Sequence, residues 1–476
     1  MDIMDLVSKG IVKIVSGYGK KVGKRKTADE IEKVQPTVMK GDCYNIGFST
    51  AEIMPDLTKD TTYWIAGHGS GHKMEGVLTP VYTSAVWIDC GNNEGMLWIG
   101  ADIVGMTNIE VMKVRSMLAD FAEEVNCKCI NISVTHSHSG IDTLGYWGKP
   151  FASIPSDGKD PDYMDMLMNT MVKVCKEAYA NKKAGKLYLG TKYLKGAQQT
   201  GRATKGLNET LTRLRFVPDD GSTETWIMNF AAHPNSLGGS NRMLSGEYPY
   251  FMREEIKAAC GANVLYGIGA IGGVDMADFD EEDNVNNIKL QGKTLAQGAL
   301  AIDNDKELEP EITVVQQKFY LPVDNNVLML LGMRQTFSND PYPCDSSELG
   351  VALKSEMTYM KIGSQQILLV PGEMFQSTVY GGYDEAEISS TGLGEDANPT
   401  PLVEVANDPN LVVFGVSNDM TGYCVPPNDF VLNKTQPYLN TARDRFDRRH
   451  YHETNSMGPN TQKVIKETFE DILKRV

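Results

Sequence analysis

The sequence predicts a mixed α/β fold in which layered mixed sheets are flanked by helices within one large domain. Segments with the two-residue period of strands alternate with segments that have the period of helices along most of the chain. We find no internal repeat and no low-complexity linker that would divide them. With 476 residues, the chain is long enough to bury a large core.

The N-terminus predicts a helical arm over about residues 1–40, ahead of a domain that spans residues 41–476. A basic stretch from Lys20 to Lys26 follows the apolar part of this arm. The arm is either a helix docked on the domain with a solvated basic loop, which we favour, or an anchor in a membrane interface. The apolar positions that share one helix face are Ile3, Leu6, Val7, Ile11, Ile14 and Val15.

The next segments predict a hairpin with strands at 85–89 and 95–99, a helix at 111–125 and a buried strand at 129–134. A second amphipathic helix is expected at 163–180, where a methionine-rich face indicates core packing. We also expect strands at 186–194, 211–217, 225–230, 312–320, 359–362, 367–370 and 411–416, helices at 250–259, 290–301 and 462–476, and a long loop at 387–408.

The composition excludes several classes of protein. A formal charge of −16 and an isoelectric point near 5.0 argue against non-specific nucleic-acid binding. No stretch is long and apolar enough to span a membrane, and the acidic N-terminus lacks the features of a secretion signal. The 8 scattered cysteines form no disulfide framework, so we expect reduced thiols in a cytoplasmic protein. The oligomeric state stays open.

Two histidines at a strand end are the strongest chemical signal. His136 and His138 lie one residue apart, directly after the predicted strand 129–134 and before Gly140. The chain has only 7 histidines. Side chains at such a strand end can be held rigidly toward a cleft, as metal ligands and general acids or bases usually are.

Three more strand ends each present one polar group. His233 precedes a proline that ends a strand, Glu373 follows the predicted strand 367–370, and Tyr423 follows the predicted strand 411–416. Taken alone, each of these residues could simply be part of the core or of a turn. Together, two histidines and a glutamate are a standard zinc set with an open position for water. A zinc-bound water can ionise near neutral pH and attack an acyl carbon.

Taken together, these motifs resemble the neutral (non-lysosomal) ceramidase family. The resemblance covers most of the chain, from about residue 44 to about residue 460. The runs that carry it are Tyr44–Ile53, Thr135–Gly140, Asn229–Ser236, Val370–Glu373, Ser417–Tyr423 and Gly458–Pro459.

The resemblance implies the family's catalytic-domain fold and hydrolysis of an amide by a metal-activated water. It implies one zinc ion per chain, although another divalent metal is compatible with such ligands. His138 matches a family histidine near the metal, suited to proton transfer or to holding the site. Arg202 matches a substrate-contacting segment and is expected to bind the scissile carbonyl or a substrate anion. The implied zinc ligands are His136, His233, Glu373 and Tyr423.

The sequence also departs from the family pattern. Asp275 stands where the ceramidases carry a serine, and Met276 replaces a proline. A carboxylate at 275 could act as a general base for the zinc water, or bind a substrate cation or hydroxyl groups. The chain is also short for the family's C-terminal Ig-like domain. We therefore expect a smaller, soluble substrate in place of ceramide.

Three further segments offer weaker candidates. His68 lies in the glycine-rich run Gly67–His72, which we interpret as a substrate-facing loop, with a plain turn as the alternative. Tyr451 and His452 are substrate-side candidates because relatives carry a Tyr-Glu pair nearby. The acidic run 275–283 lacks the spacing of a calcium loop and is interpreted as solvated.

The sequence thus supports a metal-dependent amidohydrolase that acts on a small acylated molecule. Two alternatives stay open. An esterase or lactonase could use the same zinc site, because zinc polarises an ester carbonyl equally well. A metal-containing binding protein without catalysis is the other, and the substitution at Asp275 is its main support.

Overall fold

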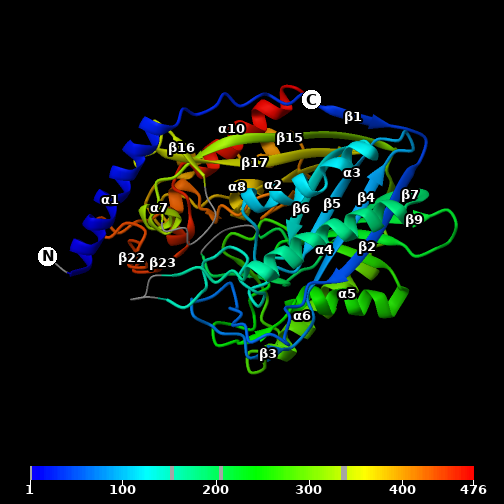
Figure 1. The fold of residues 1–476 in the computed structure, drawn as a ribbon, viewed down its shortest axis with the longest axis horizontal. Helices are drawn as coiled ribbons and strands as arrows, with labels where there is room; N and C mark the ends of the chain where they lie inside the picture. Colours follow the sequence, from blue (N-terminus) through cyan, green and yellow to red (C-terminus); the bar gives the residue numbers. More distant parts are fainter. Residues whose placement is uncertain (1–2, 151–154, 203–206, 334–339) are drawn as a thin grey trace.

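The computed structural model describes residues 3–150, 155–202, 207–333 and 340–476 (Figure 1). Its centre is a pair of sheets. The larger sheet has the strand order β12-β10-β9-β7-β2-β4-β5-β6, with β14 paired to β7. Its strands are β2 (Tyr44–Glu52), β4 (Tyr82–Asp89), β5 (Gly95–Ala101), β6 (Cys127–Val134), β7 (Lys183–Tyr193), β9 (Thr210–Pro218), β10 (Thr225–Phe230), β12 (Asn263–Ile268) and β14 (Lys306–Glu307).

The second sheet has the order β1-β15-β17-β18-β20, with β16 paired to β17. Residues of both sheets, such as Trp98 and Phe414, share one buried apolar cluster, so the sheets pack face to face. The strands of this sheet are β1 (Thr37–Lys40), β15 (Glu311–Pro322), β16 (Pro341–Pro343), β17 (Val351–Ile362), β18 (Gln365–Leu369) and β20 (Val412–Phe414).

Helices cover the outer face of each sheet (Figure 1). The large sheet packs against α2 (Asn108–Met117), α4 (Pro161–Ala180), α5 (Glu247–Cys260) and α6 (Asn284–Leu300). The second sheet packs against α1 (Ile3–Arg25), α7 (Asn326–Met333) and α10 (Thr461–Leu473). The predicted mixed α/β fold with layered sheets and flanking helices is therefore confirmed. The remaining helices are α3 (Ala119–Glu124), α8 (Gln376–Tyr380) and α9 (Leu402–Val405).

Helix α4 illustrates how local sequence sets an element. Asp160 caps it by accepting a hydrogen bond from the Tyr163 amide, and Pro161 occupies its first turn. The methionines of its inner face, among them Met164, Met168 and Met171, are buried against β2 and β4. The methionine-rich face is thus core, as predicted.

Several elements differ from the sequence prediction. The helix expected at 111–125 is divided at Leu118 into α2 and α3. Residues 20–25 continue α1 and do not form a loop, and residues 37–40 form β1, which pairs with β15. Helix α7 was not predicted, and β17 is much longer than the predicted 359–362. The limits of the N-terminal arm and of the following domain remain a prediction.

Short strand pairs lie outside the two sheets. They are β3 (Gly76–Val77) with β11 (Met243–Leu244), β8 (Gln198–Thr200) with β13 (Val274–Met276), β19 (Glu373–Met374) with β21 (Tyr423–Cys424), and β22 (Ala442–Arg443) with β23 (Arg449–His450). Among the described residues, no helix is both long and apolar enough to cross a bilayer.

Candidate metal centre

His136 follows β6 in a left-handed backbone conformation with φ of 60°. Its Nδ1 lies 2.6 Å from the carbonyl oxygen of Val104. Because a carbonyl only accepts, Nδ1 carries the hydrogen and Nε2 presents its lone pair. Burial lowers the pKa of His136 to about 4, so the ring is neutral at physiological pH.

His233 is held in the same way beyond the end of β10. Its Nδ1 donates to the carbonyl of Val274 at 2.9 Å, and its backbone amide donates to the same carbonyl. Its Nε2 lies 2.8 Å from Oε2 of Glu373. The same carboxylate oxygen lies 3.7 Å from Nε2 of His136. A carboxylate and an imidazole nitrogen come this close only with a proton or another cation between them.

Glu373 and Tyr423 are brought together by backbone pairing. Strands β19 and β21 are parallel, and these two residues are direct register partners. Both side chains are buried, and the Tyr423 hydroxyl donates a hydrogen bond to the carboxylate. Burial raises the pKa of Glu373, but the neighbouring histidines and Tyr423 outweigh it and hold the pKa below its usual value. The carboxylate is therefore ionised and able to act as a ligand.

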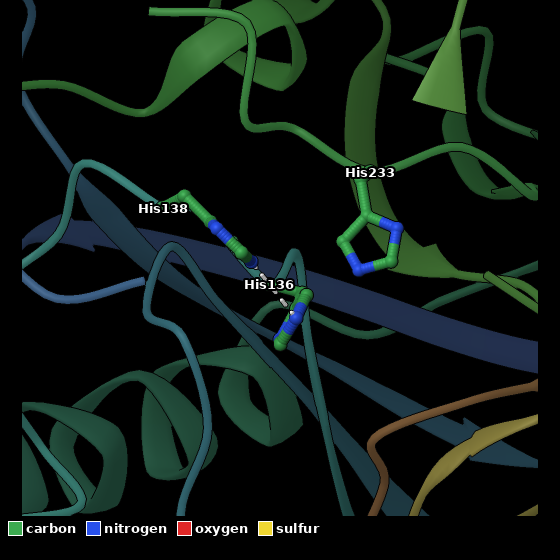
Figure 2. Close-up of side chains that lie close together, drawn as sticks. All are labelled: His136, His138 and His233. Carbon is green, nitrogen blue, oxygen red and sulfur yellow. Dashed lines mark hydrogen bonds between the residues drawn. The ribbon is translucent and has the colours of Figure 1, made fainter. Parts of the chain in front are cut away.

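His138 completes a cluster of three imidazoles with His136 and His233 (Figure 2). One ring nitrogen from each lies within 4.8 Å of the others, and all three rings are buried. The dashed line in Figure 2 joins Nε2 of His138 to Nε2 of His136 at 3.1 Å. Nδ1 of His138 has no hydrogen-bond partner in the described part of the chain. His138 thus lacks the carbonyl anchor that fixes the other two rings.

Asp275 lies at the rim of this cluster. It forms a backbone bridge with His233, and its side chain is 38% exposed. Oδ1 accepts a hydrogen bond from the side-chain Nδ2 of Asn235 at 2.9 Å and lies 3.8 Å from Nδ1 of His233. Because that Nδ1 already donates to Val274, the Asp275 carboxylate can interact with groups that enter from solvent.

The other predicted residues lie around the cluster in different settings. The His68 ring lies 5.1 Å from that of His138, and its buried Nε2 has no hydrogen-bond partner among the described residues. Tyr451 is 47% exposed. Its ring stacks on His452 at 4.0 Å and lies 6.2 Å from the ring of Tyr423.

Arg202 is buried in a charged network of its own. It donates to Asp429 at 2.9 Å, to Glu453 at 3.2 Å and to Nδ1 of His452 at 2.8 Å. Its guanidinium is therefore already engaged by protein groups, and direct contact with a substrate remains a prediction. The position of His452 beside Tyr423, with ring centroids 4.5 Å apart, connects this network to the cluster.

A cavity of about 160 Å³ opens onto the cluster. His136, His138, Glu373, Tyr423 and His68 contribute to its lining. Most of the remaining lining is apolar and comes from Val104, Leu144, Tyr146, Trp147, Leu328, Met420 and Met457. A second cavity of about 340 Å³ shares Thr107, Met420, Thr421 and Met457 with the first. Sequence patterns did not indicate these wall residues, because they come from loops and from α7.

The donor set could hold a metal ion. His136 is neutral and presents its Nε2 lone pair, while burial lowers the pKa of His233 but the Glu373 carboxylate outweighs it and holds the pKa above its usual value. Nε2 of His233 therefore shares a proton with the ionised carboxylate, a proton that a bound metal ion would replace, and the Tyr423 phenol lies beside them. Nδ1–H groups anchored to main-chain carbonyls are the usual support for metal-ligating histidines. The structure thus brings the four predicted ligands together, with His138 as a fifth group.

No family model matches the sequence. The structure is similar to that of neutral ceramidase from Pseudomonas aeruginosa, with a TM-score of 0.66 and 16% identity. That match covers 92% of this chain and 75% of the ceramidase. A ceramidase complexed with C2 matches with a TM-score of 0.67 and 16% identity, over 91% of this chain and 75% of that one.

The chain has the neutral ceramidase fold. The resemblance inferred from the strand-end motifs is therefore confirmed at the level of the fold. At 16% identity, the similarity shows that the fold is shared and does not show the activity. Within this fold the four residues follow strands of both sheets: His136 follows β6, His233 follows β10, Glu373 follows β18 and Tyr423 follows β20.

Proposed function

We propose that this protein is a zinc-dependent hydrolase that cleaves the amide bond of a small acylated molecule by means of a metal-activated water. The observation that carries the proposal is the matched anchoring of His136 and His233 by main-chain carbonyls. This anchoring directs both Nε2 atoms to the Glu373 carboxylate. A purely structural role would not require two histidines to be anchored by Nδ1–H groups around one buried acid.

His136, His233, Glu373 and Tyr423 are the proposed ligands of one zinc ion per chain. Zinc held there would polarise the substrate carbonyl and lower the pKa of its water to about 7. Buried rings with fixed tautomers need no reorganisation to serve as ligands. A histidine and carboxylate set also accepts other divalent metals, so metal analysis must precede any assignment.

His138 and Asp275 are the proposed proton-transfer groups. Nε2 of His138 donates to the lone pair on Nε2 of His136. Once that lone pair is bound to zinc, either nitrogen of the His138 ring can carry the proton, because no carbonyl holds its Nδ1. It can therefore accept a proton from the attacking water or donate one to the departing amine. Asp275 faces solvent beside the cluster and can receive the proton or hold the amine half of the substrate.

The apolar cavity wall is proposed to bind the acyl half of the substrate, while His68, Tyr451 and Asp275 contact the amine half. An amide is favoured over an ester because both structural neighbours are ceramidases and ceramide is an N-acyl amide. Arg202 is proposed to act on the substrate through His452, which it holds by a hydrogen bond to Nδ1. We also propose a cytoplasmic location, in keeping with eight free cysteines.

Elemental analysis of protein purified without added metal tests the proposal. We expect about one zinc per chain in the wild type and its loss in His233→Ala. His72→Ala is the matched control, since His72 lies outside the cluster and should leave the metal in place. Absence of metal from the wild type would contradict the proposed site.

Turnover is then measured on matched N-acyl and O-acyl compounds that share one acyl chain. A preference for the amide that is lost in His136→Ala supports the amidohydrolase. An ester preference of orders of magnitude would instead assign the same site to an esterase. Metal binding without turnover of any such compound would assign it to a binding protein.

A further inference from the structure

Helix α1 lies at the edge of the molecule, with one face against the domain (Figure 1). Ser8, Val15 and Val22 recur at seven-residue spacing and are buried. Gly19 lies on the same face, where a Cβ atom would come within 1.9 Å of the Leu349 carbonyl oxygen. Only glycine permits this close approach. The packing face of α1 is therefore fixed, and so are the faces that it turns to solvent.

The solvent side of α1 carries large apolar side chains. Leu6, Val7 and Ile14 are 55%, 46% and 55% exposed. Val7 and Ile14 are seven residues apart and so lie on one line along the helix. Scattered exposed apolar residues are ordinary, but several on two turns of one helix indicate an interaction surface.

Next to this apolar line runs a line of lysines. Lys13, Lys20 and Lys24 share one line, and Lys21 extends the line of Val7 and Ile14. All four lysines are exposed, and none forms an ion pair within the described ranges. Residues 1–26 contain seven Lys and Arg against two Asp, whereas the whole chain has a formal charge of −16. The segment that contains α1 therefore has a net positive charge in an otherwise acidic protein.

We infer that α1 binds reversibly to the surface of a membrane that contains anionic lipids. A helix with lysines beside an exposed apolar line is typical of segments that lie in a bilayer interface. The exposed apolar side chains of Leu6, Val7 and Ile14 insert among the lipid headgroups, and the lysines on the same side of the helix pair with anionic headgroups. The acidic remainder of the protein is repelled, so α1 determines which side faces the membrane.

A polyanion such as nucleic acid would account for the lysines but not for the exposed apolar line. An acidic protein partner would need a groove that accepts this line. A lipid surface satisfies both features without a specific partner, and it requires no membrane-spanning helix.

The position of α1 relates this surface to the cavities. Helix α1 packs against α7, whose Leu328 lines the cavity at the histidine cluster. Lys26, which follows α1, lies 4.1 Å from the ring of Tyr342, a residue of the second cavity. If the proposed amide hydrolysis is correct, binding through α1 brings these cavities close to the membrane surface.

The test is co-sedimentation of the full chain with phosphatidylcholine vesicles, with and without phosphatidylserine. We expect binding to the phosphatidylserine vesicles that weakens in high salt. Combined replacement of Lys13, Lys20, Lys21 and Lys24 by Gln should reduce the affinity by at least about tenfold. Combined replacement of Leu6, Val7 and Ile14 by Ser should reduce it at least as strongly.

A matched control replaces four exposed lysines away from α1, namely Lys195, Lys257, Lys289 and Lys293, by Gln. This control changes the net charge equally and should bind vesicles like the wild type. Unchanged thermal unfolding of each variant shows that the fold is intact.

Absence of binding to anionic vesicles, or binding unaffected by the α1 replacements, would overturn the inference. Equal binding of duplex DNA by the wild type and the serine variant would also overturn it. None of these results depends on turnover, so they are independent of the proposed function.

Discussion

The three clustered histidines differ in the hydrogen-bond partner of one ring nitrogen, Nδ1. His136 and His233 donate Nδ1–H to carbonyl oxygens, whereas Nδ1 of His138 has no partner among the described residues. The spacing of His136 and His138 in the sequence does not show which ring is anchored, because the anchoring carbonyl of Val104 belongs to a loop far away in the sequence. The left-handed backbone of His136 costs about 1–3 kcal/mol. This backbone conformation directs the His136 ring toward the other two histidines.

Replacement of Asp275 tests whether this carboxylate handles protons or binds the substrate. For Asp275→Asn we expect kcat for the amide to fall by about 10²–10⁴ with zinc content unchanged, because the amide group cannot accept a proton. Asp278→Asn is the control, since Asp278 is exposed on the following loop. Steady-state kinetics distinguish the roles: a raised KM with unchanged kcat would show that Asp275 only holds the amine half.

Short strands determine the site at the scale of elements. The pairing of β19 with β21 places Glu373 beside Tyr423, and the loop before β21 depends on Gly422. This glycine has φ of 75°, and a Cβ atom there would lie 1.8 Å from the Asn455 carbonyl oxygen. Any side chain at this position must therefore displace the loop that carries Tyr423.

We expect Gly422→Ala to lower the free energy of unfolding by about 1–3 kcal/mol, the cost typical of an incompatible backbone position. Because the displacement moves Tyr423, zinc affinity should fall as well. Denaturant unfolding and metal titration measure the two effects. Gly221→Ala provides the comparison, since Gly221 also has a positive φ of 71° but no atom within 4 Å of the added Cβ. A loss of stability with unchanged zinc affinity would show that Tyr423 is not a ligand.

The sequence predicted elements best where a local pattern is complete. Helix α4 has a cap, a proline in its first turn and a continuous apolar face, and it was predicted almost to the residue. Strand β17 was mostly missed because polar residues such as Glu356 lie in its buried part, where Arg115 pairs with the carboxylate. The four proposed ligands were named because each follows a predicted strand in a motif that resembles the ceramidase family, and their role as ligands stays a prediction. The residues of the cavity walls were not predicted, because they come together only through tertiary packing.

At the scale of the whole molecule, the candidate centre lies where the two sheets meet. His136 and His233 extend from the large sheet, while Glu373 and Tyr423 follow strands of the second sheet. Buried polar groups also join the sheets nearby: the Asn418 side chain donates to Asn131 on β6, and its Oδ1 accepts from the Ile132 amide. A metal held by ligands from both sides would cross-link the sheets.

Removal of the metal should therefore destabilise the whole fold and not only the site. A ligand that binds only the folded state at 100 times its Kd contributes about 2.7 kcal/mol to stability. For a chain of this size we expect chelation to lower the thermal midpoint by at least about 2–4 °C, and added zinc to restore it. Differential scanning calorimetry of wild type and His233→Ala measures this. The variant should melt like the chelated wild type and gain nothing from zinc. If chelation changes activity but not the midpoint, the metal would be held by groups of one sheet alone, and the cross-link between the sheets would be disproved.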